Sequence, residues 1–592
     1  RTVWLMVVAG LAVYYRAART RVRGPMRVEV PPESRVEREQ ILTEGVESWS
    51  RFLTRVEEGT TSGMTDRGAA FAHSPLTTRY LLQLPPPTAS DNISDLERLR
   101  RGIRQAGGPG HAQVSLAEVR RLGRLLRRSD WQVTVTLGER DGVPEVVAVE
   151  PGDTSERNWG VAVDVGTTTV VASLVELGSG RTAGTEATHN RQILHGHDVI
   201  TRIVQAEKEG GLETLQRAVV DTINELIEAL VTEAGITPQE VTGVTCAGNT
   251  TMIHLLLRLS PSYLRRAPYV PMVSRLAAVH AVETGLKVHP RALVDCLPAV
   301  SSFVGGDITA GVLASGLDQA ERPCMLIDLG TNGEIVLGNR EWLVCCSASA
   351  GTAFEGSGVR CGARAVQGVA IDPETFAVAC DTVGDEAPIG ICGSGFIDLL
   401  AELFGCGLID RQGKLQAGAG TPRIRQGRGG LEFVVVWAEG SGTGWDIAVS
   451  QATIDNLVRA KGAIYSGAKV LVDKVGLRFE EIERIFVGGG FGNHLDIDKA
   501  VRIGLLPDLP EERFQFIGNS SLAGARMALL SRQAATAAHQ IAGRMTNLEL
   551  CEEPTYMGEY VGSLFLPHTD IDLFPTVKQH LVEMDPCPAR SR

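Results

Sequence analysis

Two segments of the chain share one pattern, in which aspartate is the last polar residue of an apolar strand and a turn of glycine and threonine follows. The first segment runs from Trp159 to Val165, turns at Gly-Thr-Thr-Thr and continues as residues 170–177. The second runs from Met325 to Leu329, turns at Gly-Thr-Asn-Gly and continues as residues 334–337. Apolar runs joined by short glycine-containing turns predict two β-hairpins. Because the same unit occurs twice, the chain is predicted to contain a diverged internal duplication.

The residues of these turns are suited to binding phosphate and a metal ion. Backbone N–H groups of a glycine-rich turn can donate to phosphate oxygens, and an aspartate at a strand end can hold Mg²⁺ through water. A plain hairpin would use the same turn residues, so one hairpin alone leaves both interpretations open. The repetition, with Asp164 in one hairpin and Asp328 in the other, favours phosphate and Mg²⁺ held from two sides. The candidate nucleotide-binding residues are Gly166, Thr167, Thr168 and Thr169, and Gly330, Thr331, Asn332, Gly333 and Glu334.

A third glycine-rich turn follows the apolar residues 485–487. It consists of Gly488, Gly489, Gly490, Phe491 and Gly492. Glycine lets a ligand approach the backbone closely, and a simple strand-to-helix turn does not require this many glycines. We therefore expect this segment to line a nucleotide site as well.

With these motifs in this order, the sequence resembles the superfamily of ATPases that includes acetate kinase, sugar kinases, heat-shock chaperones and actin. The resemblance implies an α/β fold of two RNase-H-like lobes with ATP between them. It identifies Asp164 with the phosphate-1 motif, Asp328 with the phosphate-2 motif and residues 488–492 with the adenosine motif. Residues 306–317 are similar to the connecting helix of the chaperones, and their small side chains would let two helices cross closely.

Asp307 lies at the predicted start of that connecting helix, where two roles are open. Aspartate is a favoured N-cap residue. In a catalytic cleft, the same carboxylate would orient the attacking water. Asp307 is therefore a candidate catalytic residue, together with Asp164 and Asp328.

Several ordered motifs give a closer resemblance, to the reductive activators of corrinoid proteins. This resemblance implies ATP-driven reduction of cob(II)alamin to cob(I)alamin in a corrinoid protein or corrinoid-dependent methyltransferase, usually by a homodimer. It adds Gly393, Ser394 and Gly395 to the predicted nucleotide-binding residues. The motifs are residues 85–99, 149–169, 248–252, 328–337, 392–395 and 560–575.

The family organisation and the residue patterns together predict the domains. Helical spacing of apolar residues at 116–126 and strand-like runs at 133–137 and 146–149, around a turn at Asp141-Gly142, predict a small α+β unit. The expected boundaries are an N-terminal remnant at 1–35, a linker at 36–75, a middle α+β domain at 76–156 and the ATPase domain at 157–592, with lobes at about 157–322 and 323–592.

Cysteine usage bears on the redox chemistry. The chain has eleven cysteines, none before Cys246 and none in a C-x-x-C pair. This pattern excludes a zinc ribbon or a disulfide-stapled secreted domain and indicates reduced, cytoplasmic thiols. Family members normally begin with a plant-type [2Fe–2S] ferredoxin domain, and its ligands have no counterpart in this sequence. We therefore expect either a truncated or frame-disrupted gene, or electrons from a separate ferredoxin-type donor.

Other function classes stay open or are excluded by composition. A small-molecule kinase and a chaperone-like, nucleotide-gated binding module are the alternatives on the same fold. The net charge of −12 argues against a nucleic-acid partner. The apolar run at 3–15 is short for a membrane span, which leaves a clipped anchor or signal segment as one interpretation of the N-terminus and predicts that the rest does not enter a membrane.

Weaker signals each have a structural alternative. His195 and His197 could bind a metal or lie in an exposed loop before a helix capped by Asp198. Glu355 could line the cleft or belong to a turn. The arginines between 98 and 128 form a solvated face or dock an acidic partner. Cysteines that could suggest a cluster are more simply small buried hydrophobes; these are Cys345, Cys346, Cys361, Cys392 and Cys406.

Overall fold

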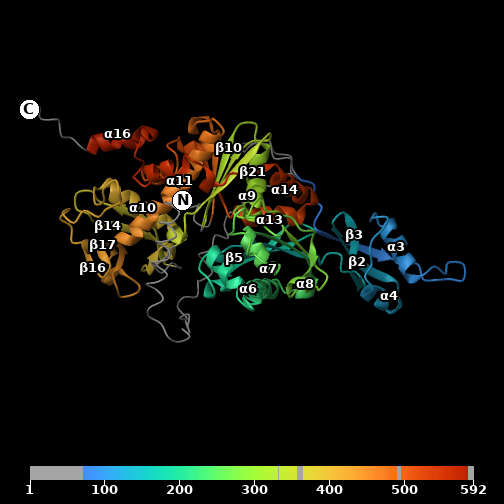
Figure 1. Cartoon of the computed structure of the whole chain (residues 1–592). Coiled ribbons are helices and arrows are strands. Elements are labelled where there is room, and N and C mark those ends of the chain that lie inside the picture. Colours follow the sequence, from blue (N-terminus) through green and yellow to red (C-terminus); the bar gives the residue numbers. More distant parts are fainter. Residues whose placement is uncertain (1–70, 331, 356–363, 490–494, 585–592) are drawn as a thin grey trace, which may run out of the picture. The chain divides into compact units, whose positions relative to one another are not determined.

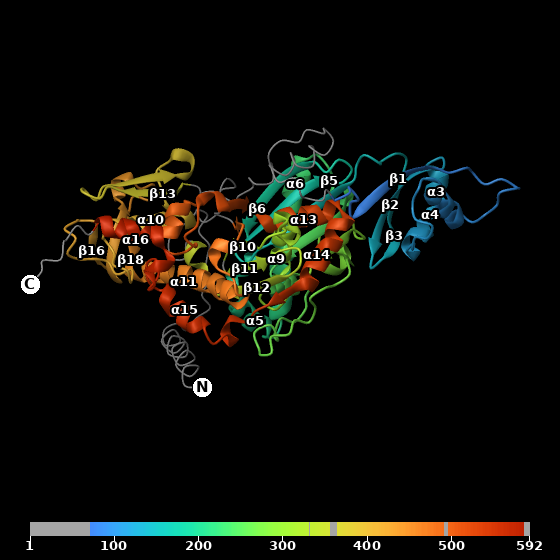
Figure 2. The ribbon, with the colours of Figure 1, turned by 90° about the horizontal axis from the view of Figure 1, so that it is seen from above.

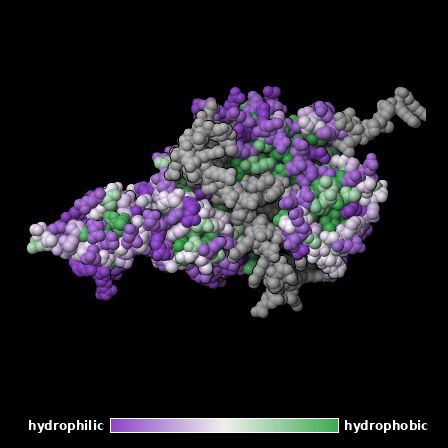
Figure 3. Space-filling model, turned by 180° about the vertical axis from the view of Figure 1, so that it is seen from behind, coloured by the Kyte–Doolittle hydropathy of each residue, from purple (hydrophilic) through white to green (hydrophobic). Residues whose placement is uncertain are grey.

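The computed structural model describes residues 71–330, 332–355, 364–489 and 495–584 (Figure 1). Within these residues it shows one three-stranded antiparallel sheet near the start, two six-stranded sheets, and two further three-stranded sheets inserted late in the chain. No helix in this described part is long and apolar enough to cross a membrane. The face seen in Figure 3 is mostly hydrophilic, with apolar side chains in separate areas.

The first described unit is a small α+β layer. Strands β1, β2 and β3 pair antiparallel in that order, and Leu99, Leu126 and Val133 are fully buried between the sheet and two helices. The β2–β3 loop is Asp141-Gly142, both with positive φ, the geometry of a tight hairpin turn. The elements are β1 (Thr77–Gln83), α3 (Asp95–Gln105), α4 (Leu116–Arg128), β2 (Gln132–Arg140) and β3 (Val143–Pro151).

The first six-stranded sheet has the order β6-β5-β4-β7-β9-β8. Strand β4 is antiparallel to β5 and parallel to β7, which is in turn parallel to β9. The long helix α6 packs on β5 and β6. The elements are β4 (Trp159–Val165), β5 (Thr169–Glu176), β6 (Thr182–His189), α5 (Val199–Ala206), α6 (Gly211–Glu233), β7 (Val241–Gly248), α7 (Thr250–Leu256), β8 (Val279–His280), α8 (Ala281–Thr284) and β9 (Leu293–Cys296).

The second six-stranded sheet repeats this plan in the order β20-β19-β10-β11-β12-β21. Strand β10 is antiparallel to β11 and parallel to β19, which is parallel to β20. Thus β10, β11, β12, β19 and β20 correspond to β4, β5, β6, β7 and β9, and the predicted duplication is confirmed. The strands are β10 (Cys324–Leu329), β11 (Gly333–Gly338), β12 (Leu343–Ala348), β19 (Arg484–Gly488), β20 (Phe514–Gly518) and β21 (Met545–Asn547).

Two helices of small residues cross between the sheets, as the sequence predicted. Helix α9 (Gly306–Ser315) follows β9, and α13 (Ser520–Leu530) follows β20. Figure 1 shows both between the sheets, and Figure 2 shows α14 (Arg532–Arg544) beside them. A Cβ atom on Gly524 would lie 2.3 Å from the carbonyl oxygen of Ala310, so only glycine allows this crossing distance.

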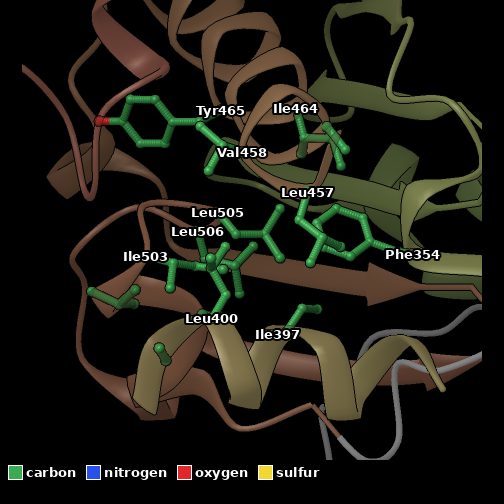
Figure 4. Close-up of a cluster of buried hydrophobic side chains, with 14 of the residues drawn as sticks. Phe354, Ile397, Leu400, Leu457, Val458, Ile464, Tyr465, Ile503, Leu505 and Leu506 are labelled. Carbon is green, nitrogen blue, oxygen red and sulfur yellow. The ribbon is translucent and has the colours of Figure 1, made fainter. Parts of the chain in front are cut away.

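The second half is enlarged by inserted elements that share one core. Phe354, Leu400, Leu457 and Ile464 meet there, on α10, α11 and the segment before them (Figure 4). The elements are β13 (Ala365–Ile371), β14 (Val378–Thr382), β15 (Gly390–Ile391), α10 (Gly393–Gly405), β16 (Ile424–Gly427), β17 (Gly430–Val436), β18 (Ile447–Ser450), α11 (Gln451–Lys474), α12 (Ile497–Arg502), α15 (Tyr556–Ser563) and α16 (Pro575–Met584).

A buried lysine fixes the segment after α15 to α11. Lys461 is fully buried, and its Nζ donates to the carbonyl oxygens of Phe565 at 2.5 Å and Pro567 at 2.6 Å. Tyr465, one turn further along α11, packs its ring against His568 and Phe574. The motif at 560–575 therefore has a structural role in covering α11.

Candidate functional site

Four acidic side chains converge where equivalent strands of the two sheets end. Asp164 is near the end of β4 and Asp328 near the end of β10, while Asp307 is in the first turn of α9. Glu334, in β11, is the direct cross-strand partner of Asp328. The sequence had singled out all four, from segments far apart in the chain.

These carboxylates affect one another electrostatically. Burial raises the pKa of Asp307 to about 7, and the charges of Asp328 and Asp164 add to this effect. Burial and the charge of Asp164 raise the pKa of Asp328 to about 6. Burial, followed by the charges of Asp307 and Asp328, raises the pKa of Glu334 above its ordinary value. The three aspartates nevertheless keep part of their surface accessible.

In the part of the chain that the structure describes, none of these four carboxylates forms an ion pair with a basic side chain. Like charges brought together in a poorly hydrated place favour a bound cation or a retained proton. Within the same described residues, no three His, Cys, Asp or Glu side chains are grouped to ligate a metal ion directly. Among the described residues, the negative charge of this cluster is therefore not balanced by a basic side chain.

Asp307 does not act as the N-cap of its helix. The N-cap of α9 is Gly305, and the Asp307 carboxylate accepts from the N–H of Ile308 at 2.9 Å. The alternative that Asp307 is the helix cap is therefore wrong. A carboxylate in the first turn is still stabilised by the helix dipole, and its raised pKa suits it to accept a proton near neutral pH.

The sequence did not indicate the residues that hold Asp164. Asn519 Nδ2 donates to Asp164 Oδ2 at 2.9 Å, and Ser521 Oγ donates to Asp164 Oδ1 at 2.8 Å. Between them, Ser520 Oγ lies 3.5 Å from Asp328 Oδ2. The only local signal was a polar Asn-Ser-Ser after the apolar strand β20, which reads as an ordinary helix start.

Polar side chains brace the first turn from behind, and two of them, Asn190 and Arg202, are fully buried. Asn190 donates to the carbonyl of Gly166, and Asn249 Nδ2 donates to Thr167 Oγ1, both at 2.9 Å. Arg202, fully buried on α5, donates to the carbonyl of Thr167 at 2.6 Å. Thr168 also accepts, through its carbonyl, from the backbone of Asn190, and Thr169 opens β5. The turn is thus held in one shape before any ligand binds.

The described residues of the second turn and of the glycine run lie beside Asp328. Gly330 N donates to the carbonyl of Asn332 at 3.0 Å, and Gly333 begins β11. Gly488 pairs with Asp328 across β10 and β19, and a Cβ atom there would lie 3.4 Å from Asp328 Oδ2. Gly489 has a φ of 110°, a conformation open to glycine. Thr331, Gly490, Phe491 and Gly492 lie outside the described residues.

The Gly393-Ser394-Gly395 motif has contacts of a different kind. It forms the start of α10, and Ser394 Oγ donates to the carbonyl of Gln367 at 2.9 Å. A Cβ atom on Gly395 would lie 2.3 Å from the carbonyl oxygen of Val366. These contacts join α10 to β13, and none of the polar contacts described for the motif reaches the four carboxylates.

The candidate metal-binding histidines and the candidate cluster cysteines have structural explanations, as far as the structure describes them. His195 and His197 are exposed, and Asp198 caps α5 by accepting from Thr201 N at 2.8 Å, as predicted. Cys345 and Cys346 are buried with raised thiol pKa values, which confirms them as small hydrophobes. Cys361 and the Glu355 side chain lie outside what is described.

Profiles of known families cover almost all of the described chain. Residues 67–156 match the RACo linker region, residues 159–320 the RACo middle region, and residues 322–578 the C-terminal domain of RACo, the ASKHA domain.

Individual relatives agree with these matches. The corrinoid activation enzyme RamQ of Eubacterium limosum is 34% identical over 413 residues, which cover 68% of this chain and 69% of RamQ. The [Co(II) methylated amine-specific corrinoid protein] reductase of Methanosarcina barkeri is 24% identical over 446 residues, covering 69% of this chain and 76% of the reductase. A solved structure described as a reductive activator for corrinoid,iron-sulfur protein superposes with a TM-score of 0.81 at 44% identity, covering 86% of this chain and 82% of that one.

Proposed function

The chain belongs to the family of reductive activators of corrinoid proteins, and we propose that it binds Mg·ATP and uses its hydrolysis to promote reduction of a corrinoid protein. The partner is a corrinoid-dependent, methyl-transferring protein whose cob(II)alamin gains one electron to become cob(I)alamin. The ATP part rests on one observation: Asp164 and Asp328, near the ends of equivalent strands of the two duplicated sheets, converge with Asp307, and no basic side chain among the described residues pairs with them.

The residues divide the work of binding. Asp164 and Asp328 would hold Mg²⁺ through its waters, since both are carboxylates at a partly accessible site. The braced turn at 166–169 and the turn that includes Gly330 and Asn332 offer N–H groups for the phosphates. Gly488 and Gly489 leave the backbone open for the rest of the nucleotide. Mg²⁺ at this place would neutralise charge on the phosphates and on the clustered carboxylates.

Asp307 is suited to the hydrolytic step. A pKa raised to about 7 leaves a share of Asp307 ionised at neutral pH, so its carboxylate can accept a proton from the attacking water as that water bonds to the terminal phosphorus. The products are ADP and phosphate. Burial raises the pKa of Glu334 above its ordinary value, and its carboxyl accepts a hydrogen bond from Ser347 Oγ at 3.3 Å beside the same cluster.

The electron that reduces cob(II)alamin does not come from ATP. ATP hydrolysis transfers no electron, so a low-potential donor must supply one for each cob(II)alamin reduced. We propose a ferredoxin-type protein as that donor, and a homodimer as the working assembly. Residues 1–245 contain no cysteine, so they supply no thiolate ligand for such a donor's cluster.

The experiment reconstitutes the reaction. This protein, Mg·ATP, a cob(II)alamin-form partner and a low-potential reductant are mixed with and without a separate [2Fe–2S] ferredoxin, and cob(I)alamin is followed by absorbance. We expect ATP-dependent reduction whose rate rises with added donor, because an untethered donor has a low effective concentration. Asp164→Asn and Asp328→Asn should abolish it, while the surface control Asp473→Asn should not.

Two outcomes would contradict the proposal. Reduction that is equally fast without ATP would remove the energy-coupling role. Phosphate transfer to an added small molecule, with no effect of the corrinoid partner on ATP turnover, would identify a kinase on the same fold.

A further inference from the structure

The duplication makes α9 and α13 equivalent helices, and their first turns can be compared position by position. The N-caps are Gly305 and Asn519, and two residues later stand Asp307 and Ser521. Asp307 adds its negative charge to that of Asp328, whereas Ser521 donates a hydrogen bond to Asp164. The two halves of the site have therefore diverged, with repelling carboxylates on one side and a hydrogen-bonded carboxylate on the other.

Both oxygens of Asp164 are occupied by donors from one helix start. Asn519 reaches Oδ2 and Ser521 reaches Oδ1. The amide of Asn519 has a defined orientation because its Oδ1 caps α13 by accepting from Leu522 N at 2.8 Å, which turns Nδ2 toward Asp164. Ser521 is itself buried. Two donors at fixed places leave the carboxylate one orientation.

Asn519 and Ser521 follow β20, which belongs to the same sheet as β10, the strand that carries Asp328. Asp328 pairs with Gly488, and Gly488 pairs with Gly518, the residue before Asn519. The second sheet therefore positions Asp328 directly and Asp164 through hydrogen bonds. A fixed distance between these two groups is what a metal held from both sides requires.

We infer that Asn519 and Ser521 are positioning residues that hold Asp164 in the orientation needed for Mg·ATP. The inference rests on the proposed function, since it concerns the same site. Their hydrogen bonds to a charged oxygen are of the strong class. Loss of either should weaken Mg·ATP binding by about 10- to 100-fold, the range for removing a hydrogen bond to a charged group.

The test uses the full chain and titration calorimetry with Mg·ATP. Asn519→Asp keeps the helix cap, because aspartate caps as well as asparagine, but replaces the donor toward Asp164 with an acceptor. Ser521→Ala removes the second donor, and Ser521→Thr restores a hydroxyl. Ser450→Ala, which removes the N-cap of α11 away from the carboxylates, is the control for a purely structural loss.

The expected result is weaker Mg·ATP binding in Asn519→Asp and Ser521→Ala, recovery in Ser521→Thr, and no change in Ser450→Ala. In the Asp164→Asn background, Ser521→Ala should cause no further loss, because Ser521 acts through Asp164. Unchanged affinity in both variants, or losses that add fully in that background, would overturn the inference.

The experiments distinguish failure of the positioning role from failure of the proposed corrinoid function. If the wild-type chain binds Mg·ATP and the variants weaken it, but no cob(I)alamin forms with any donor, the positioning role stands and the corrinoid role falls. If wild-type and variants bind equally and cob(I)alamin forms, the corrinoid role stands and the positioning role falls. Absence of any Mg·ATP binding by the wild type would overturn both.

Discussion

Asp307 and Ser521 occupy the same position in two helices related by the internal duplication, one adding a charge beside Asp328 and the other donating to Asp164. Five carboxylates would crowd the site if both positions were acidic. Ser521 adds no charge to the cluster, and its hydroxyl donates a hydrogen bond that orients Asp164. The difference predicts that substitutions at the two positions affect different steps.

Asp307→Asn should lower ATP turnover by about 10²- to 10⁴-fold, the usual contribution of a group that accepts a proton from the reacting water. Mg·ATP affinity should change little, because the amide keeps the size and one oxygen of the carboxylate. Phosphate release and calorimetry measure the two quantities. Loss of thermal stability with full turnover would show that Asp307 serves only the helix.

Mg·ATP affinity should rise with pH through the interval from about 6 to 7. Burial raises the pKa of Asp328 to about 6 and of Asp307 to about 7, so protons compete with the cation below these values. The free energy of unfolding of the ligand-free protein should change in the opposite direction and fall as the pH rises. Because the folded-state pKa values lie above the ordinary 3.8, the protonated carboxyls contribute their full stability below pH 3.8, and this contribution is lost as the pH rises through about 6 and 7. Melting temperatures with and without Mg·ATP should therefore diverge as pH rises, and a constant difference would contradict this.

Arg202→Met should weaken nucleotide binding although Arg202 lies behind the turn. The guanidinium donates to the carbonyl of Thr167, and its removal leaves a buried oxygen without that donor, at a cost of about 1–3 kcal/mol. The loss should appear both in the free energy of unfolding and in Mg·ATP affinity. Arg191→Met, at an exposed ion pair with Glu225, is the control that should change neither by much.

Lys461→Met should destabilise the fold and leave Mg·ATP binding intact. The carbonyls of Phe565 and Pro567 would each lose a donor, at about 1–3 kcal/mol for each group left unpaired. Denaturant unfolding gives the stability, and calorimetry gives the affinity. Lys469→Met, whose lysine pairs with Asp473 on the surface of the same helix, should be nearly neutral. A large loss of affinity with unchanged stability would assign Lys461 to the site instead.

The parts of the fold that follow local rules could be predicted from sequence. Asp164 and Asp328 were found because each ends an apolar strand before a glycine-threonine turn, a signal contained in a few consecutive residues. Asp307 was found as the acidic start of a small-residue helix. The sequence left open whether Asp307 caps that helix; it does not, because the helix begins at Gly306 and its N-cap is Gly305.

The contacts that complete the site depend on tertiary structure. Asn519 and Ser521 read locally as a helix start, and only the packing of α13 against β4 brings them to Asp164. Arg202 looks like one polar residue on a short amphipathic helix, yet it is fully buried beneath a turn formed by residues 166–169. No spacing along the chain encodes either arrangement.

The close crossing of α9 and α13 limits how the two halves can move. The backbone of Gly524 lies directly against Ala310, so no Gly524 side chain separates the two helices at this point. Because a Cβ atom on Gly524 would lie 2.3 Å from the carbonyl oxygen of Ala310, the two helix backbones are already as close here as a glycine contact allows. A single added methyl group in Gly524→Ala would therefore force the two helices apart, and with them the two halves of the chain that carry Asp164 and Asp328.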